Sequence, residues 1–176
     1  MASMAEAEAT PADPAGPAAL EAAYREQYRS LVRLAALLLD DVATCEEVVQ
    51  DAFVSVWRRP GAVRDAERLP AYLRSAVLNG ARSALRRRGV ARRHLASAPP
   101  PSPGADEVAL AGDVDRSVLQ ALRALPDRQR EVLVLRYYLD LSEAEIAATL
   151  GISAGSVKTH AHRGLAALTD RLEDLG

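Results

Sequence analysis

The chain of 176 residues has little cysteine and few large aromatic residues. Cys45 is the only cysteine, which excludes an intrachain disulfide and a thiolate metal cluster. With one Phe and one Trp, the core must consist mainly of Leu, Val and Ala, and Leu and Ala favour helix. The sequence has no run of alternating β-branched residues with a turn at each end, as strands would require. We therefore predict an all-α protein.

Long apolar runs and metal-ligand clusters are also lacking. No stretch approaches the roughly 18 apolar residues of a membrane span, and the acidic first residues do not resemble a signal peptide. We expect no membrane insertion and a cytoplasmic location. His160 and His162 differ by two positions, so they lie on opposed sides of a helix and cannot easily chelate one metal. We expect no metal and no cofactor.

Charge is distributed unevenly along the chain. The net charge is −2, which by itself argues against a nucleic-acid-binding protein. However, residues 1–57 carry −7, residues 58–98 carry +9 and residues 99–176 carry −4. A basic middle between acidic flanks indicates one surface for an anion and other surfaces for different partners.

Periodicity and breaker residues predict two small helical bundles joined by a Pro-rich linker. Proline occupies four of the five positions from 99 to 103, which indicates an extended spacer. We expect a disordered segment over 1–18, a first bundle over 19–95, a flexible linker over 96–112 and a second bundle over 113–176. The expected helices are 20–39, 43–58, 70–88, 113–124, 127–139, 142–150 and 154–172.

The second bundle contains a helix-turn-helix pattern. Ser142 and Glu145 have the spacing of a capping box, Gly151 permits a left-handed turn, and Ser153 can cap the next helix. An ordinary helical hairpin is the alternative. Val157, Ala161, Leu165 and Leu168 form the expected inner stripe of the last helix. The opposite face and its edges carry hydrogen-bond donors that can contact bases or phosphates. These residues are Ser156, Lys158, Thr159, His162 and Arg163.

The first bundle contains two helices with distinct outer faces. In residues 45–57, an apolar face opposes Glu47, Gln50 and Asp51. The alternative to a binding role is that these three residues form a solvated charged face. In residues 71–88, one face combines an aromatic ring, an amide and guanidinium groups, as single-stranded DNA binding requires. A solvated basic helix is the alternative there. This outer stripe consists of Tyr72, Ser75, Asn79, Arg82 and Arg86.

Both bundles resemble sigma-70 family members, specifically extracytoplasmic-function (ECF) sigma factors of the actinobacterial type. Residues 45–57 resemble sigma region 2.2, which implies that Glu47, Gln50 and Asp51 bind the β′ clamp coiled coil of RNA polymerase core. Residues 71–88 resemble regions 2.3–2.4, which implies −10 element binding and opening. Residues 125–160 resemble region 4, which implies binding to the −35 element and the β flap. The resemblance allows an anti-sigma factor as a further partner but does not require one.

Other classes of function fit the sequence less well than a sigma factor does. A helix-turn-helix transcriptional regulator would bind an operator without being a polymerase subunit, but the stretch similar to region 2.2 argues against it. An enzyme is not expected, because the sequence shows no nucleophile–base constellation, phosphate loop or metal cluster. A helical adaptor that binds only protein does not account for the two basic faces.

Overall fold

The all-α prediction is confirmed. The computed structural model describes residues 16–175 except 60, 62, 64 and 93–102, and these described residues form helices and no strand. One α-helix, α6, is followed directly by a π-helical turn, η2. The elements are α1 (Pro17–Leu38), α2 (Val42–Trp57), η1 (Ala66–Arg68), α3 (Leu69–Arg92), α4 (Ala105–Ala111), α5 (Arg116–Arg123), α6 (Asp127–Leu133), η2 (Val134–Tyr138), α7 (Glu143–Leu150) and α8 (Ala154–Leu175).

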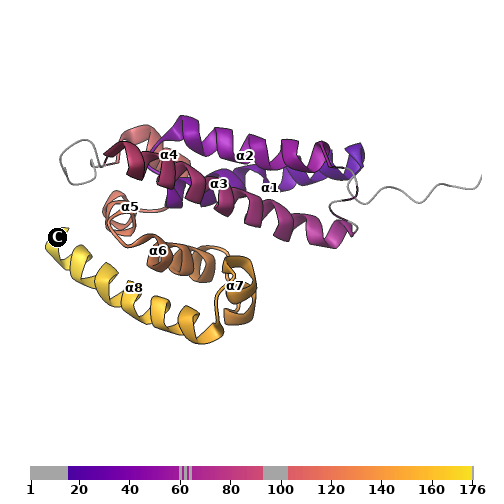
Figure 1. Ribbon diagram of the computed structural model, residues 1–176. Helices are drawn as coiled ribbons and strands as arrows, with labels where there is room; N and C mark the ends of the chain where they lie inside the picture. Colours follow the sequence, from indigo (N-terminus) through magenta and orange to yellow (C-terminus); the bar gives the residue numbers. More distant parts are fainter. Residues whose placement is uncertain (1–15, 60, 62, 64, 93–102, 176) are drawn as a thin grey trace, which may run out of the picture.

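The helices form two layers that lie against each other (Figure 1). Helices α1, α2 and α3 pack together as the N-terminal bundle, and α5 to α8 form the C-terminal bundle. Helix α4 lies against α1, beside the N-terminal bundle. Hydrogen bonds to backbone carbonyls of α1 help to join the bundles: Tyr138 donates to Ser30 at 3.2 Å, and Arg123 donates to Ala36 at 3.4 Å.

The N-terminal bundle buries one apolar face of α2 and one of α3, each with its residues spaced at the helical period. In α2 these residues are Cys45, Val49, Ala52, Phe53 and Val56, and in α3 they are Leu73, Val77, Ala81 and Ala84, all at most 6% exposed. A small residue lets α3 approach α2 closely, because a Cβ at Gly80 would lie 2.7 Å from Val48 Cγ1. The outer faces of both helices are thereby fixed relative to each other.

The start of α2 is fixed by an aspartate cap. Asp41 accepts a hydrogen bond from the Thr44 backbone N–H at 2.7 Å. Arg88 of α3 pairs with Asp41 at 3.2 Å and with Asp40, so the same turn ties α3 to α2. The hydrogen bonds from Thr44 lower the pKa of Asp41 below its ordinary value of 3.8. This stabilisation is present above that value and is lost as the pH falls through the lower folded-state pKa.

Removing this cap should destabilise the protein. We expect Asp41→Ala to lower the free energy of unfolding by about 1 kcal/mol, because an N-cap side chain satisfies an otherwise unpaired N–H. Asp41→Asn should lose less, since Asn is an equally good cap and only the charge is removed. Urea denaturation at pH 7 measures the free energy of unfolding of both variants. Equal losses would show that the charge of Asp41, rather than its capping hydrogen bond, provides the stabilisation.

The structure differs from the sequence prediction at both edges of the N-terminal bundle. Residues 1–15 of the expected disordered segment lie outside the described residues, and α1 already begins at Pro17. Within the expected linker, residues 105–111 form α4. Glu107 stabilises this short helix, because it accepts a hydrogen bond from the Gly104 N–H at 3.3 Å and pairs with Arg123 at 2.6 Å. The tertiary contact explains why the local sequence did not reveal the helix.

Candidate nucleic-acid interface

Helices α7 and α8 form the predicted helix-turn-helix. Ser142 and Glu145 make the reciprocal capping bonds, at 3.3 Å from the Glu145 N–H and 2.8 Å from the Ser142 N–H. The Ser142 hydroxyl also donates to Glu145 Oε2 at 2.7 Å, and this bond, together with the one from the Ser142 N–H, lowers the pKa of Glu145. Gly151 adopts φ 64° and ψ 39°, the left-handed conformation that the turn requires. Ser153 caps α8 by accepting the Ser156 N–H at 3.1 Å.

Helix α8 presents a polar face away from the rest of the bundle. Val157 and Ala161 are buried as predicted, whereas the prediction that Leu165 is buried was wrong, since it is 45% exposed. Gly164 takes the inner position instead, and a Cβ there would lie 3.2 Å from Leu133 of α6. This close approach turns Leu165 outward.

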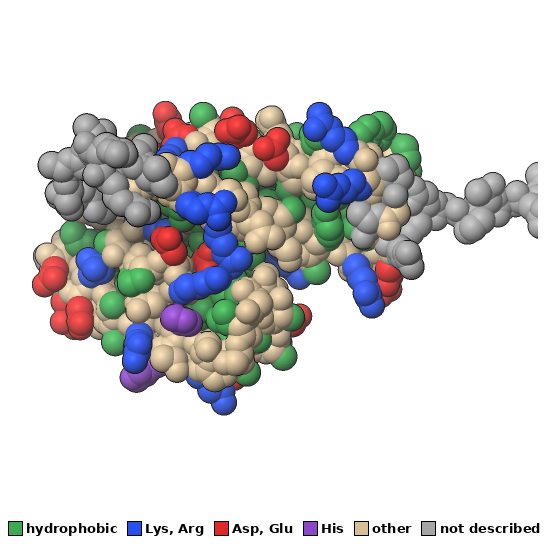
Figure 2. Space-filling model, in the orientation of Figure 1, with side chains coloured by type: hydrophobic (Ala, Val, Ile, Leu, Met, Phe, Trp, Pro, Cys, Tyr) green, Lys and Arg blue, Asp and Glu red, His purple; other side chains and the backbone are tan. Residues whose placement is uncertain are grey.

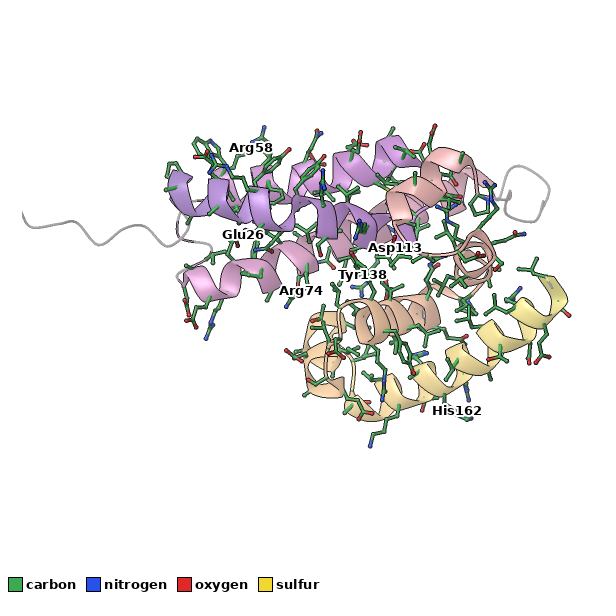
Figure 3. The ribbon with its side chains drawn as sticks, turned by 180° about the vertical axis from the view of Figure 1, so that it is seen from behind. Glu26, Arg58, Arg74, Asp113, Tyr138 and His162 are labelled. Carbon is green, nitrogen blue, oxygen red and sulfur yellow. The ribbon has the colours of Figure 1, made fainter. Side chains whose placement is uncertain are left out.

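The predicted base-reading side chains of α8 lie on its accessible side. Lys158, Thr159, His162 and Arg163 are exposed and Ser156 is half-buried. Figure 3 shows His162 pointing away from the protein. The Thr159 hydroxyl donates to the Gly155 carbonyl at 3.0 Å, and Lys158 Nζ lies 3.7 Å from Glu143. The helix thus offers hydroxyl, imidazole, ammonium and guanidinium groups on one surface.

The polar face of α2 is also accessible. Glu47, Gln50 and Asp51 are exposed. Gln50 hydrogen-bonds the hydroxyl of Tyr28, whose pKa is raised chiefly by burial. Glu47 and Asp51 line a groove of about 260 Å³ between α2 and α3, with Arg87 at its other side. An acidic rim of this kind suits a basic partner.

The outer stripe of α3 is only partly available. Asn79 and Arg86 are exposed, while Tyr72 and Ser75 are half-buried, with Tyr72 packed against the core. Arg82 pairs with Glu131 of α6, with Nε 2.6 Å from Oε1. In Figure 2, Lys and Arg side chains run from the N-terminal bundle across the junction with the C-terminal bundle. Sequence reasoning missed the Arg82–Glu131 pair, because nothing local indicates a contact between residues 49 positions apart.

The described residues carry no sign of a metal centre or a reactive thiol. Among them, no group of three His, Cys, Asp or Glu side chains is placed to hold a metal ion. No helix in this part of the chain is long and apolar enough to cross a membrane. Cys45 is buried, and desolvation raises the pKa of its thiol to about 12, so the thiolate is scarce at neutral pH.

Two family matches cover the two bundles. Residues 23–91 match Sigma-70 region 2, and residues 115–168 match Sigma-70, region 4. The chain is 36% identical over 172 residues to the ECF RNA polymerase sigma factor SigL of Mycobacterium tuberculosis, covering 92% of this chain and 96% of SigL. It is 33% identical over 150 residues to the RNA polymerase sigma-E factor of Streptomyces avermitilis, covering 85% and 82% of the two chains.

Solved structures agree with this assignment. The fold matches the sigma factor RpoE in complex with the anti-sigma factor NepR from Bartonella quintana, with a TM-score of 0.70, 22% identity and coverage of 87% of this chain and 96% of RpoE. It also matches CnrH in complex with the cytosolic domain of CnrY, with a TM-score of 0.67, 26% identity and coverage of 92% and 93%. With regions 2 and 4 in order along its length, the chain belongs to the sigma-70 family and to its ECF group.

Proposed function

We propose that this protein is the sigma subunit that gives RNA polymerase its promoter specificity at transcription initiation. The observation that carries the proposal is the presence, on one chain, of an exposed acidic α2 face and a capped helix-turn-helix. The sigma-70 family is not a class of enzymes. The protein accordingly has no catalytic activity of its own and acts in the cytoplasm, where the polymerase works.

Each exposed face is assigned one partner. Glu47, Gln50 and Asp51 bind the β′ clamp coiled coil of the core enzyme, since a carboxylate-rich rim is complementary to basic side chains. The outer stripe of α3 binds and opens the −10 element. The polar face of α8 enters the major groove of the −35 element, in the manner of a recognition helix.

The C-terminal bundle also offers an apolar surface. Tyr137 is 63% exposed and Leu165 is 45% exposed, and both line a groove of about 300 Å³ with Val118 and Leu168. Contiguous exposed apolar side chains of this kind mark protein-binding surfaces. We assign this groove to the β flap of the polymerase. An anti-sigma factor, of the kind that NepR is for RpoE, would compete for such polymerase-binding surfaces.

The α3 stripe should separate DNA opening from DNA binding. We expect Asn79→Ala to reduce open-complex formation by roughly tenfold or less, because a hydrogen bond from its amide to a base, worth about 0.5–1.5 kcal/mol, forms only once the strands separate. Closed-complex binding should change little. Permanganate reactivity of −10 thymines measures opening, and gel-shift at low temperature measures closed complexes. If permanganate reactivity is unchanged, the assignment of Asn79 to opening is wrong.

Replacing Arg86, Arg87 and Arg88 by Ala together should instead weaken the salt dependence of DNA binding. Each lost phosphate contact reduces the number of counterions released on binding, by about one ion or less. Because Arg88 also pairs with Asp40 and Asp41, the Arg86 and Arg87 double variant is the control for lost stability. An unchanged slope of affinity against salt in both variants would remove the phosphate role.

A helix-turn-helix regulator acting without the polymerase is the second candidate. The two functions differ in what the free protein binds. The sigma subunit should bind duplex promoter DNA tightly only when core polymerase is present, whereas the regulator should bind its operator equally well alone. Gel-shift with the protein alone, core alone and both together distinguishes them.

A further inference from the structure

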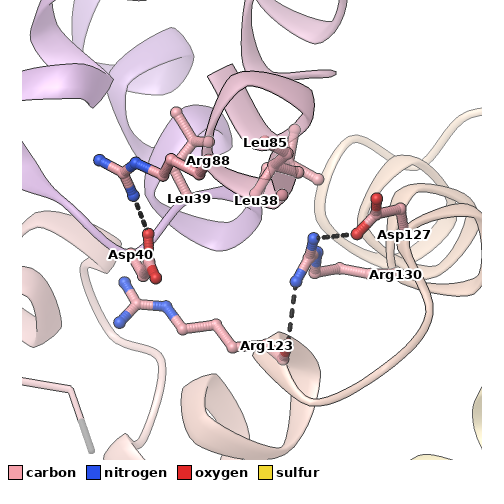
Figure 4. Close-up of a pocket in the computed structure, with 9 residues that line it drawn as sticks. Leu38, Leu39, Asp40, Leu85, Arg88, Arg123, Asp127 and Arg130 are labelled. Carbon is pink, nitrogen blue, oxygen red and sulfur yellow. Dashed lines mark hydrogen bonds and ion pairs between the residues drawn. The ribbon is translucent and has the colours of Figure 1, made fainter. Parts of the chain in front are cut away.

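A polar cavity lies where α3 of the N-terminal bundle meets α5 and α6 of the C-terminal bundle (Figure 4). Its volume is about 250 Å³, several times the roughly 30 Å³ that one water molecule takes up in the liquid. Each of these three helices contributes one arginine to the lining, namely Arg88, Arg123 and Arg130. The acidic side chains of the lining are Asp40 and Asp127. The lining therefore carries one more positive than negative charge, which favours an anionic occupant.

Two of these arginines have a buried donor without a partner. The side chains of Arg123 and Arg130 are each 5% exposed. Arg123 uses its terminal nitrogens for Glu107, which does not line the cavity, and for the Ala36 carbonyl. Arg130 uses its own for Asp127 and for the Arg123 carbonyl. The Nε atom of each arginine is buried and has no hydrogen-bond partner. A buried donor left unpaired is unfavourable, so an acceptor is expected beside each Nε.

The positive charge of Arg130 is incompletely compensated by its neighbours. Desolvation lowers the pKa of Arg130 below its ordinary value, although the carboxylates of Asp127 and Glu131 act to raise it. An additional negative charge at the cavity would offset this cost of burial. An oxyanion places several acceptor oxygens on one centre, and such charge-assisted hydrogen bonds are stronger than neutral ones. Pockets for larger organic ligands usually measure about 300–1,000 Å³, so the group inside this cavity is a small one.

We propose that the cavity binds a small phosphorus oxyanion, which accepts hydrogen bonds from Nε of Arg123 and Nε of Arg130. Arg88 adds a positive charge from α3, so the oxyanion is held by three helices that lie apart in the sequence. Free phosphate or diphosphate and the terminal phosphates of a nucleotide share this chemistry. With a nucleotide, the ribose and the base remain outside the cavity. The site is independent of the faces assigned to promoter DNA and to polymerase, and its test uses neither partner.

Gly89 offers a variant that adds a group to the cavity without removing an existing contact. Gly89 lines the cavity, and a Cβ there would have no neighbour within 4 Å. Gly89→Glu brings a carboxylate on a flexible side chain next to the arginines, where it competes with the oxyanion and should abolish binding. Gly89→Ala is the matched control, because it makes the same change of backbone freedom and leaves the cavity open. Gly89→Ala should bind the oxyanion as the wild type does.

Thermal unfolding of the full-length protein in sodium phosphate, with ionic strength held constant by sodium chloride, measures binding. A ligand that binds only the folded state stabilises it. The melting temperature of the wild type and of Gly89→Ala should rise by roughly 5–10 °C when phosphate exceeds its dissociation constant about a hundredfold. Phosphate also stabilises proteins in general, because it is excluded from their surface. The difference between Gly89→Ala and Gly89→Glu, rather than the rise itself, is therefore the test.

Isothermal titration calorimetry with diphosphate and with ATP then distinguishes the two sources of the oxyanion. Tighter binding of ATP assigns the cavity to the phosphates of a nucleotide, and tighter binding of diphosphate assigns it to the free oxyanion. If Gly89→Glu loses helical circular dichroism, Gly89→Gln replaces it, since it narrows the cavity without adding charge and should weaken binding. If the glutamate or glutamine variant that folds gains as much from phosphate as Gly89→Ala, and neither diphosphate nor ATP binds the wild type, the cavity holds only water and the proposal is wrong.

Discussion

Asp51→Arg is expected to lower the affinity for core RNA polymerase by roughly 10- to 100-fold. Asp51 is exposed on α2 beside Glu47, outside the buried face of that helix. Reversing its charge replaces an attraction to basic side chains on the clamp coiled coil by a repulsion, and like charges across an interface cost several kcal/mol. Each factor of ten in affinity corresponds to about 1.4 kcal/mol.

The fold should be unaffected by this change, because surface substitutions away from caps and cores usually alter stability by about 0.5 kcal/mol or less. Glu173→Arg on α8 is the matched control, since it makes the same charge reversal at an exposed position far along the chain. Affinity is measured by biolayer interferometry with purified core enzyme, and thermal unfolding checks stability. Equal affinities of Asp51→Arg and wild type would remove the docking assignment of α2.

Arg163→Ala is expected to flatten the preference of the holoenzyme for one or two −35 base pairs. Thr159 and Arg163 lie one helical turn apart on the exposed side of α8, opposite the buried Val157 and Ala161. A guanidinium can make paired bonds to guanine, and such a contact is worth about 1–3 kcal/mol of discrimination against the wrong base. That corresponds to roughly 5- to 150-fold between the best and the changed base pair.

Lys158→Ala is the matched comparison, because Lys158 lies at the edge of the same face and we assign it to phosphate. Its loss should weaken binding to all sequences about equally. Lys158 also lies 3.7 Å from Glu143, so its pairing is weak and easily exchanged for phosphate. Binding to a panel of single-base −35 variants at fixed salt measures both effects. If Arg163→Ala weakens every sequence equally and keeps their order, Arg163 contacts the backbone instead.

The helices and most of their buried faces could be predicted from the sequence. The spacing of Val49, Phe53 and Val56, and of Leu73 and Val77, follows the period of a helix, and packing of one face is what such a pattern indicates. Caps and turns are local as well, so Ser142, Glu145 and Gly151 have the expected roles. The accessible faces of α2 and α8 follow by elimination, because they lie opposite the buried ones.

What could not be predicted depends on how separate elements approach each other. Leu165 and Gly164 are neighbours in the sequence, and only the close packing of α8 on Leu133 decides that the glycine lies inside. The pairing of Arg82 with Glu131 depends on the docking of two bundles that are joined by a Pro-rich segment. No periodicity contains that information, so the half-buried state of the α3 stripe became visible only in the fold.

Run-off transcription with purified core polymerase tests the central claim most directly. The template is a mixture of genomic promoter fragments from the source bacterium, transcribed by core enzyme with and without the full-length protein. We expect discrete transcripts that appear only when the protein is added and that are lost with Asp51→Arg. If the protein binds DNA fragments tightly on its own and adds no transcript to core enzyme, it is not a sigma subunit, and the proposed role in promoter recognition by the polymerase is wrong.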